Sequence, residues 1–562
     1  MMKCSLILAA PVLLAACQTS GGRSATLEVP VSDHLEVDAP KAQRFEEIGP
    51  YRRAVTTSSA DAQWYFDQGL AWTYSFNHDE AIRSFAKAAE LDPECAMAWW
   101  GIALCEGPNY NDPVMTDERS GAAWSALKEA EARAANASPV ERGLIEALAA
   151  RYAFPWPEDR TALNEAYAAA MEQLLTRFPE DPEVGTLYGE SLMVLRPWKL
   201  YSIDRLPEAD TGKITAALEA VIEMHPDNPG ANHLYIHAVE PSLEPERALG
   251  AADRLRNQIP VSGHMNHMPS HIYVQTGDWE KSIVQNRAAM RRDSTYLERS
   301  PQQGIQHMYI VHNAHMLAYS AMMVGQETEA MEAARSMLPG VPGPMLPAVA
   351  DFIDLWMTSV YDVQKRFGRW DAILAEPAPP EVLPITNAVW RAHRAIAYAA
   401  KKDFENAEAE QALFRAAWAA FPEDQMSGDD ATRRILEVSE HFIRGEIALQ
   451  RGQWNEAITA LKEAVEVEDS LSYGEPPQWL QPTRHTLGAV LLKAGRPAEA
   501  EVVYLEDLAK WPGNGWSLLG LSRALRAQGK LDAADDAQAR YEAAWKGADR
   551  PVTSSCLCLP DA

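Results

Sequence analysis

Residues 63–93 read QWYFDQGLAWTYSFNHDEAIRSFAKAAELDP, and this stretch decides the fold. Gly69 and Ala81 are small, so they let two helices approach each other closely. Phe85 fills the seam between the helices, and Pro93 ends the second one because proline has no amide hydrogen for the helical ladder. The stretch therefore predicts one antiparallel helical hairpin.

The same spacing of small residues recurs along the chain at intervals of 34 residues: Gly529 follows Gly495, and Ser282 follows Ala248. This is the period of the tetratricopeptide repeat, in which each hairpin leaves an apolar face that only its neighbours can cover. Alanine-rich runs also favour helix, and alternating runs of Val, Ile and Thr are almost absent. We expect an all-α tetratricopeptide solenoid, a right-handed superhelix of antiparallel helix pairs, over residues 51–547.

Several segments resemble one widespread group of bacterial tetratricopeptide-repeat proteins, lipoproteins or secreted proteins that are largely uncharacterised. They are YFDQGLAWTYSFNHDEAIRSF, CAMAWWGIALCEGPNYN, NHLYIHAVE, HMPSHIY and EPPQWLQPTRHTLG. The resemblance covers residues 51–545, nearly all of the expected mature chain. It implies the repeat fold and little chemistry, because the group is known chiefly by its repeats.

The N-terminal segment has the pattern of an export signal. In residues 1–16 a lysine precedes an apolar stretch that is too short to span a bilayer. Leu-Ala-Ala before Cys17 resembles the bacterial lipoprotein signal, in which this cysteine becomes lipidated, and Gln18 resembles the residue found in lipoproteins sent to the outer membrane. An ordinary secretory signal with a chance cysteine is the alternative. We expect residues 17–50 to form a lipid-anchored flexible tether that leaves the protein facing the periplasm or the outside.

The net charge limits which partners the protein can bind, and the cysteine positions limit which disulfides it can form. The formal net charge is -28, which repels phosphate backbones and argues against nucleic acid as a partner. Cys95 and Cys105 lie about 15 Å apart along an expected helix, too far for a disulfide. In the expected tail, residues 548–562, the pair Cys556 and Cys558 can form a disulfide, bind a soft metal or lie in a frayed end.

Histidines are concentrated in residues 225–319: of fourteen in the chain, nine lie between His225 and His315. In the tetratricopeptide family, the resemblance implies, positions 2, 5, 9, 12 and 13 of each first helix line the inner groove. Helical spacing independently puts such positions on nearly one face. In three successive units these positions hold seven histidines, namely His233, His237, His264, His267, His271, His312 and His315.

So many groove imidazoles indicate a transition-metal site. Imidazole is the commonest protein ligand for metals, and His233/His237 and His267/His271 are pairs that can chelate from one helix face. Three or four of the seven would saturate a copper, zinc or iron ion. Pro269 leaves open whether the second pair shares one helix. The alternatives are structural hydrogen bonds or a metal-free peptide-binding face.

Other polar residues are candidates for the same groove: Glu240 as a ligand or an orienting group, Tyr319, His78, Asn109, Asn111 and Glu190. His78 lies in the turn of the first unit, a turn role is equally open for the two asparagines, and for Glu190 an exposed helix position is the alternative.

Three functions remain open from the sequence. The first is a membrane-anchored binding module whose groove holds a protein segment or small ligand, with a bound metal. The second is a metalloenzyme for oxidation or hydrolysis, with Glu240 or Tyr319 near the open coordination position and the insertion at residues 293–304 as a lid. The third is a metal-free assembly scaffold. Enclosure of the site distinguishes the metalloenzyme from the other two functions, because an enzyme buries its site in a walled cavity and a scaffold leaves an open groove. Motifs of nucleotide-binding proteins, metalloproteases, c-type haem attachment and serine hydrolases are missing from the sequence.

Overall fold

The computed structural model describes residues 42–300 and 306–560. The expected signal peptide, Cys17 and most of the expected tether lie outside the described residues. Within the described part, one two-stranded sheet, β1 (Met426–Ser427) with β2 (Asp430–Ala431), accompanies a chain of helices.

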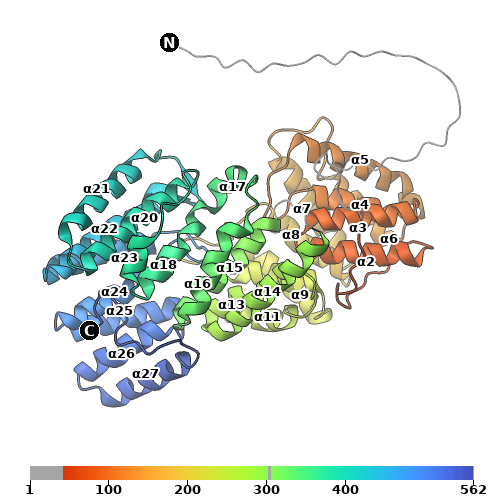
Figure 1. The fold of residues 1–562 in the computed structure, drawn as a ribbon. Helices are drawn as coiled ribbons and strands as arrows, with labels where there is room; N and C mark the ends of the chain where they lie inside the picture. Colours follow the sequence, from red (N-terminus) through yellow and green to blue (C-terminus); the bar gives the residue numbers. More distant parts are fainter. Residues whose placement is uncertain (1–41, 301–305, 561–562) are drawn as a thin grey trace, which may run out of the picture.

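The helices follow one another as antiparallel neighbours (Figure 1). The first group is α2 (Ala60–Tyr74), α3 (His78–Leu91), α4 (Ala96–Glu106), α5 (Asp117–Arg133), η1 (Ala134–Asn136), α6 (Pro139–Ala149), α7 (Thr161–Arg177), α8 (Pro182–Met193) and α9 (Thr211–Met224). The middle group is α10 (Pro229–Val239), η2 (Pro245–Ala248), α11 (Leu249–Leu255), α12 (Gly263–His267), α13 (Pro269–Thr276), α14 (Trp279–Arg299), α15 (Gln306–Met323), α16 (Glu327–Met337) and η3 (Leu338–Gly340). The last group is α17 (Leu346–Ile353), η4 (Asp354–Thr358), α18 (Ser359–Arg366), α19 (Trp370–Ala375), α20 (Pro384–Ala400), α21 (Phe404–Ala420), α22 (Thr432–Gln450), α23 (Trp454–Asp469), α24 (Thr483–Lys493), α25 (Pro497–Lys510), α26 (Gly515–Ala527) and α27 (Leu531–Ala544).

The first hairpin forms as its sequence predicts. Asn77 ends the turn between α2 and α3, and its side chain accepts a hydrogen bond from the amide of Glu80 at 3.2 Å, capping α3. A Cβ atom on Gly69 would lie 2.6 Å from the ring of Phe85, and one on Gly101 of α4 would lie equally close to the same ring. The ring of Phe85 on α3 therefore packs directly against both α2 and α4. The prediction of an all-α tetratricopeptide solenoid is confirmed.

The C-terminal hairpins fold back against the middle of the solenoid. The indole of Trp279 donates to the carbonyl of Pro512 at 2.8 Å, and that of Trp516 donates to the carbonyl of Met322 at 2.7 Å. Figure 1 shows α26 and α27 beside the middle helices, which precede them by about two hundred residues. The described chain therefore contacts itself across the solenoid and encloses space that an open superhelix would leave exposed.

Part of the expected tether is packed structure. Phe45 and Ile48 are fully buried, the amide of Phe45 donates to Gln68 at 2.8 Å, and the amide of Val261 donates to the carbonyl of Glu47 at 3.1 Å. Residues 42–50 thus differ from a free linker because burying two large apolar side chains stabilises them on the solenoid.

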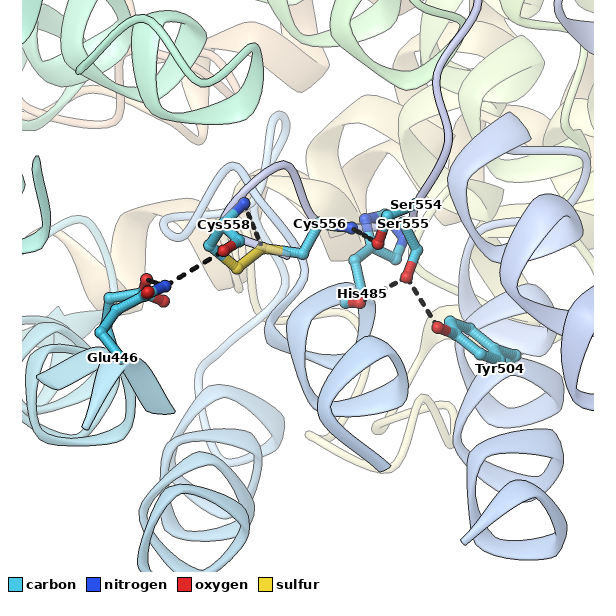
Figure 2. Close-up of a disulfide and its surroundings, with 8 residues drawn as sticks. Glu446, His485, Tyr504, Ser554, Ser555, Cys556 and Cys558 are labelled. Carbon is cyan, nitrogen blue, oxygen red and sulfur yellow. Dashed lines mark hydrogen bonds between the residues drawn. A yellow bond between two sulfur atoms is a disulfide. The ribbon is translucent and has the colours of Figure 1, made fainter. Parts of the chain in front are cut away.

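The C-terminal tail is also docked, with a disulfide between Cys556 and Cys558 (Figure 2). The hydroxyl of Ser555 bonds to that of Tyr504 at 2.6 Å and donates to the carbonyl of His485 at 2.7 Å. Of the three readings that the sequence leaves open for this cysteine pair, the structure contains the disulfide. Cys95 and Cys105 are free and buried. Among the described residues, the helices are too short or too polar to cross a bilayer.

Candidate metal centre

Helix α10 supplies the first two histidines of the centre. Asn228 caps the helix through a 2.7 Å bond from the amide of Ala231, and Pro229 occupies its first turn. His233 and His237 then lie one turn apart on the same face, and both are buried. Glu240, the C-cap residue that follows the helix, is completely buried beside them.

Three more histidines come from α12 and α13. Met268 joins the two helices with helical dihedral angles, φ -48° and ψ -39°, so Pro269 interrupts the hydrogen bonding but not the helical path. His264, His267 and His271 consequently share one buried face. Pro269 therefore does not separate His267 from His271.

The imidazoles gather into two groups of three. In each group the ligand nitrogens lie within 4.8 Å of one another. We call His233, His237 and His264 the first triad, and His267, His271 and His312 of α15 the second triad. The Nε2 atoms of His233 and His264 are 3.2 Å apart, and those of His267 and His271 are 2.6 Å apart.

Hydrogen bonds donated by Nδ1 determine which ring nitrogen is free to bind a metal. Nδ1 of His233 donates to the carbonyl of Tyr74 at 2.7 Å, and Nδ1 of His267 donates to the side-chain oxygen of Asn286 at 2.6 Å. The amide nitrogen of Asn286 donates to Ser282, so its oxygen must face the ring. In the neutral rings Nε2 therefore carries the lone pair, the arrangement typical of metal-ligating histidines.

Glu240 orients one histidine of each triad. One of its oxygens accepts from Nδ1 of His237 at 2.9 Å, and the other accepts from Nδ1 of His271 at 2.6 Å. The hydroxyl of Tyr473 donates to the second oxygen at 3.1 Å, and Glu475 also contacts Nδ1 of His271. Of the two roles that the sequence leaves open for Glu240, its hydrogen bonds support the orienting one.

Burial sets the charge of the cluster. It holds the pKa of His233, His264, His267 and His312 well below the usual value, and charged histidine neighbours act in the same direction. These rings are therefore neutral at pH 7, as metal ligands must be. His271 is the exception: although burial opposes it, the carboxylates of Glu475 and Glu240 raise its pKa to about 10.

Part of the histidine cluster lines a cavity of about 650 Å³. His237, His264, His271 and His312 form part of its wall, and Trp198, Tyr309, Trp356, Tyr473 and Glu475 lie in the rest. The wall is drawn from the α8–α9 loop, α15, η4, the β1–β2 turn and the α23–α24 loop. A cavity of this size and mixed apolar and polar lining suits a small organic molecule.

Other predicted candidates lie elsewhere. His315 lines the cavity beside Trp356 but joins neither triad, and burial lowers its pKa to about 3. Tyr319 does not line the cavity; its ring packs against Trp279 and Trp511 in the apolar core, because its position on α15 faces the folded-back C-terminal hairpins.

Three predicted groove residues, His78, Glu190 and Asn109, lie outside the large cavity. Nδ1 of His78 bonds to the carbonyl of Cys105 at 2.8 Å, and burial lowers its pKa to about 4. Glu190 is buried rather than exposed and lies 3.8 Å from Arg151, beside a separate cavity of about 20 Å³. Asn109 makes a turn, accepting from two following amides.

The predictions for Asn111 and for a lid at residues 293–304 have different outcomes. Asn111 does line the large cavity. Of the expected lid at residues 293–304, residues 293–299 are the last turns of α14, and residues 301–305 lie outside the described part of the chain.

The α23–α24 loop is the part of the site that sequence reasoning missed. Tyr473 and Glu475 contact Glu240 and His271 although they lie more than two hundred residues away in the chain. Glu475 begins EPPQWLQPTRHTLG, one of the segments that carry the family resemblance, and Tyr473 lies two residues before it; this closeness is the one sequence signal for the loop.

Comparison with known proteins adds only remote likenesses. Neither a protein-family model nor a curated protein matches the chain. The human IFIT1 dimer with m7Gppp-AAAA is similar over 88% of this chain and 91% of its own, with 14% identity and a TM-score of 0.31. The APC/C hetero-tetramer Cut9-Hcn1 is similar over 85% of this chain and 79% of its own, with 13% identity and a TM-score of 0.29. The P58(IPK) TPR domain is similar over 86% of this chain and 93% of its own, with 11% identity and a TM-score of 0.21. No functional inference follows from likenesses this remote.

Proposed function

We propose that this protein binds a transition metal through its buried histidines and holds a small organic ligand in the adjoining cavity. The chain is a tetratricopeptide-type helical repeat, a fold suited to binding a protein or a ligand. One observation carries the proposal. Nε2 of His233 meets Nε2 of His264, and Nε2 of His267 meets Nε2 of His271, while buried acceptors hold Nδ1 of His233, His237, His267 and His271.

A purely structural role explains this arrangement less well. In the metal-free protein the Nε2 atoms of His267 and His271, 2.6 Å apart, share the proton of the charged His271, and a metal ion can take the place of this proton. Nε2 of His237 is buried without a hydrogen-bond partner among the described residues although Glu240 holds its Nδ1, a cost that a bound metal ion would remove. The all-nitrogen donor set suits copper, zinc or iron.

Elemental analysis tests the proposal. Protein purified without a histidine tag should contain near-stoichiometric copper, zinc or iron. The His237→Ala/His271→Ala double variant should lose it, because one ligand of each triad is removed. His225→Ala is the control, since the ring of this partly buried histidine bonds only to the carbonyl of Glu180 among the described residues. Metal-free protein that chelator leaves equally stable would favour the metal-free scaffold.

A second candidate, a metalloenzyme for oxidation or hydrolysis, is favoured by the enclosure of the site. Three protein ligands leave a zinc-like ion one open position, and the cavity would present the bound molecule there. Glu475 lies in the cavity wall, and burial and the charge of Glu240 raise its pKa well above the usual value. It can therefore act as a proton donor beside the metal.

The catalytic candidate has its own test. Molecules that co-purify with the protein would be identified by mass spectrometry and returned to metal-loaded protein. Turnover is expected to require the metal and to fall at least tenfold in Glu475→Gln while metal content stays unchanged. Binding without any product in the wild-type protein would restrict the function to ligand binding.

We also propose that the protein is an outer-membrane lipoprotein anchored through Cys17, a residue outside the described part. The sequence pattern around this cysteine supports the proposal. Expressed in a bacterial host, Cys17→Ser should move from the membrane fraction to the soluble periplasm. An unchanged membrane fraction would contradict the lipid anchor.

A further inference from the structure

We infer that the histidines form two metal sites, one in each triad, coupled by Glu240. This inference rests on the proposed function, because it assumes that the cluster binds metal. It goes further in stating how many ions are held and how they are connected.

The two triads share no residue. The first is built by α10 and α12, and the second by α12, α13 and α15. Six imidazoles exceed the four ligands that a tetrahedral ion accepts, so one ion would leave at least two buried rings unused. Two ions use all six.

The nitrogen spacing within the first triad fits a bound ion. Two nitrogens bound to one tetrahedral zinc ion lie roughly 3.3 Å apart, given metal–nitrogen distances of about 2.0–2.1 Å. Nε2 of His233 and Nε2 of His264 are 3.2 Å apart. In the second triad the corresponding pair is 2.6 Å apart, close enough for a shared proton that a metal would replace.

Glu240 connects the triads rather than forming a third site. The group His237, Glu240 and Glu475 also brings three potential ligand atoms together. However, both oxygens of Glu240 already accept hydrogen bonds, from Nδ1 of His237 and from Nδ1 of His271. The ring centroids of these two histidines are 5.9 Å apart. One carboxylate thus fixes one ligand in each triad and sets their relative position.

Both sites open to the same cavity. His237 and His264 of the first triad and His271 and His312 of the second all line it. Each ion would have three protein ligands and one position left for an exogenous ligand. A small molecule with two donor atoms, such as a carboxylate or a phosphate, can then bind both ions at once.

Metal titration of the full mature chain tests the inference. Protein stripped by chelator would be titrated with Co²⁺, whose visible absorption reports tetrahedral binding, and its total metal measured after dialysis. We expect two equivalents in the wild-type protein and one in each triad variant, His233→Gln/His264→Gln and His267→Gln/His312→Gln. His225→Gln is the control and should keep two equivalents. Glutamine preserves polarity and much of the volume, and circular dichroism would verify folding of each variant.

The possible outcomes separate the two levels of the proposal. A single equivalent that both triad variants lose would overturn the pair of sites and leave the proposed function intact. Absence of binding in the wild-type protein would overturn both. If a triad variant fails to fold, electron paramagnetic resonance of the wild-type protein with two equivalents of Cu²⁺ decides. Magnetic coupling between the ions supports the inference, and two isolated signals contradict coupled sites.

Discussion

At the scale of single residues, the centre depends on what each imidazole does with its second nitrogen. A buried histidine without an acceptor for Nδ1 can rotate or change tautomer, and a metal site then loses its geometry. Tyr74, Asn286 and Glu240 provide these acceptors from three different segments. Glu240 matters most because it serves two rings at once.

Glu240→Gln should therefore weaken metal binding by about ten- to a hundredfold, the usual effect of losing an orienting carboxylate. The two Nδ1–H groups approach different oxygens of Glu240, and an amide would present a donor NH2 group to one of them. Competition with a chromophoric chelator would measure the loss. Glu244→Gln, an exposed change four residues away, should bind as the wild-type protein does. Equal affinities in all three proteins would assign Glu240 no orienting role.

Proton release on metal binding is the second residue-scale prediction. Since the pKa of His271 is raised to about 10, this ring is protonated at pH 7 and must lose its proton to become a ligand. Calorimetry in buffers of different ionisation enthalpy should show release of about one proton, with affinity rising as pH increases toward 10. Binding without proton release would contradict His271 as a ligand.

The same shift makes the metal-free protein sensitive to pH. A histidine whose folded pKa exceeds its unfolded value stabilises the folded state fully below pH 6.5, and this stabilisation is lost as pH rises to about 10. Metal-free protein should therefore have a higher melting temperature at pH 6.5 than at pH 10, by more than His271→Gln shows over the same range. Equal pH dependence in the two proteins would contradict the buried ion pair.

At the scale of elements, close helix approach depends on glycine. Gly488 of α24 and Gly520 of α26 both face the ring of Tyr504, as Gly69 and Gly101 face Phe85. Because a methyl group at these positions would overlap the ring, the helices would have to separate. Helix α13 depends in turn on the helical angles at Met268, which keep His271 in line with His267 despite the proline.

Gly69→Ala should destabilise the protein by about 1–3 kcal/mol through overpacking, although alanine is the better helix former. Chemical denaturation would measure the change. Gly212→Ala in α9 is the matched control, because a Cβ atom there would meet nothing within 4 Å. It should be neutral or stabilise by up to about 1 kcal/mol. A neutral Gly69→Ala would mean that the hairpins tolerate wider spacing.

The repeat frame predicted the direction of the histidines but not their partners. Position within a 34-residue unit fixes which face of a helix a residue occupies, so the rings of His233, His264 and His312 were predicted to face the groove. Distances between rings, and the contact of Glu475 with His271, depend on how distant segments pack. Tyr319 illustrates the limit: its repeat position indicates the groove, yet the C-terminal hairpins cover that part of it.

At the scale of the whole molecule, the C-terminal hairpins close the solenoid, and its groove becomes a cavity. Trp516 is completely buried, and its indole donates to the carbonyl of Met322, fastening the C-terminal hairpins to the middle helices. The loop that carries Glu475 precedes α24 and is held in place by the same packing. Neither the docking of the C-terminal hairpins nor the position of this loop follows from the repeat period, because contacts between distant repeats leave no periodic signal in the sequence.

Trp516→Ala should therefore open the cavity before it unfolds the repeats. Removing a buried tryptophan costs about 3–5 kcal/mol. We expect faster amide hydrogen exchange in residues 470–545 and faster metal loss to chelator, with α2–α9 unchanged. Leu531→Ala, an exposed apolar residue in the last hairpin, is the control. Uniform loss of protection along the whole chain would instead mean that the solenoid unfolds as one unit.

Anomalous X-ray diffraction from crystals of the metal-loaded protein tests the convergence of the histidines on metal most directly. Data collected on either side of the absorption edge should give peaks at bonding distance, about 2.0–2.1 Å, from the Nε2 atoms of both triads. A metal-loaded crystal with no peak among these rings, or with peaks only at surface residues, would contradict the account.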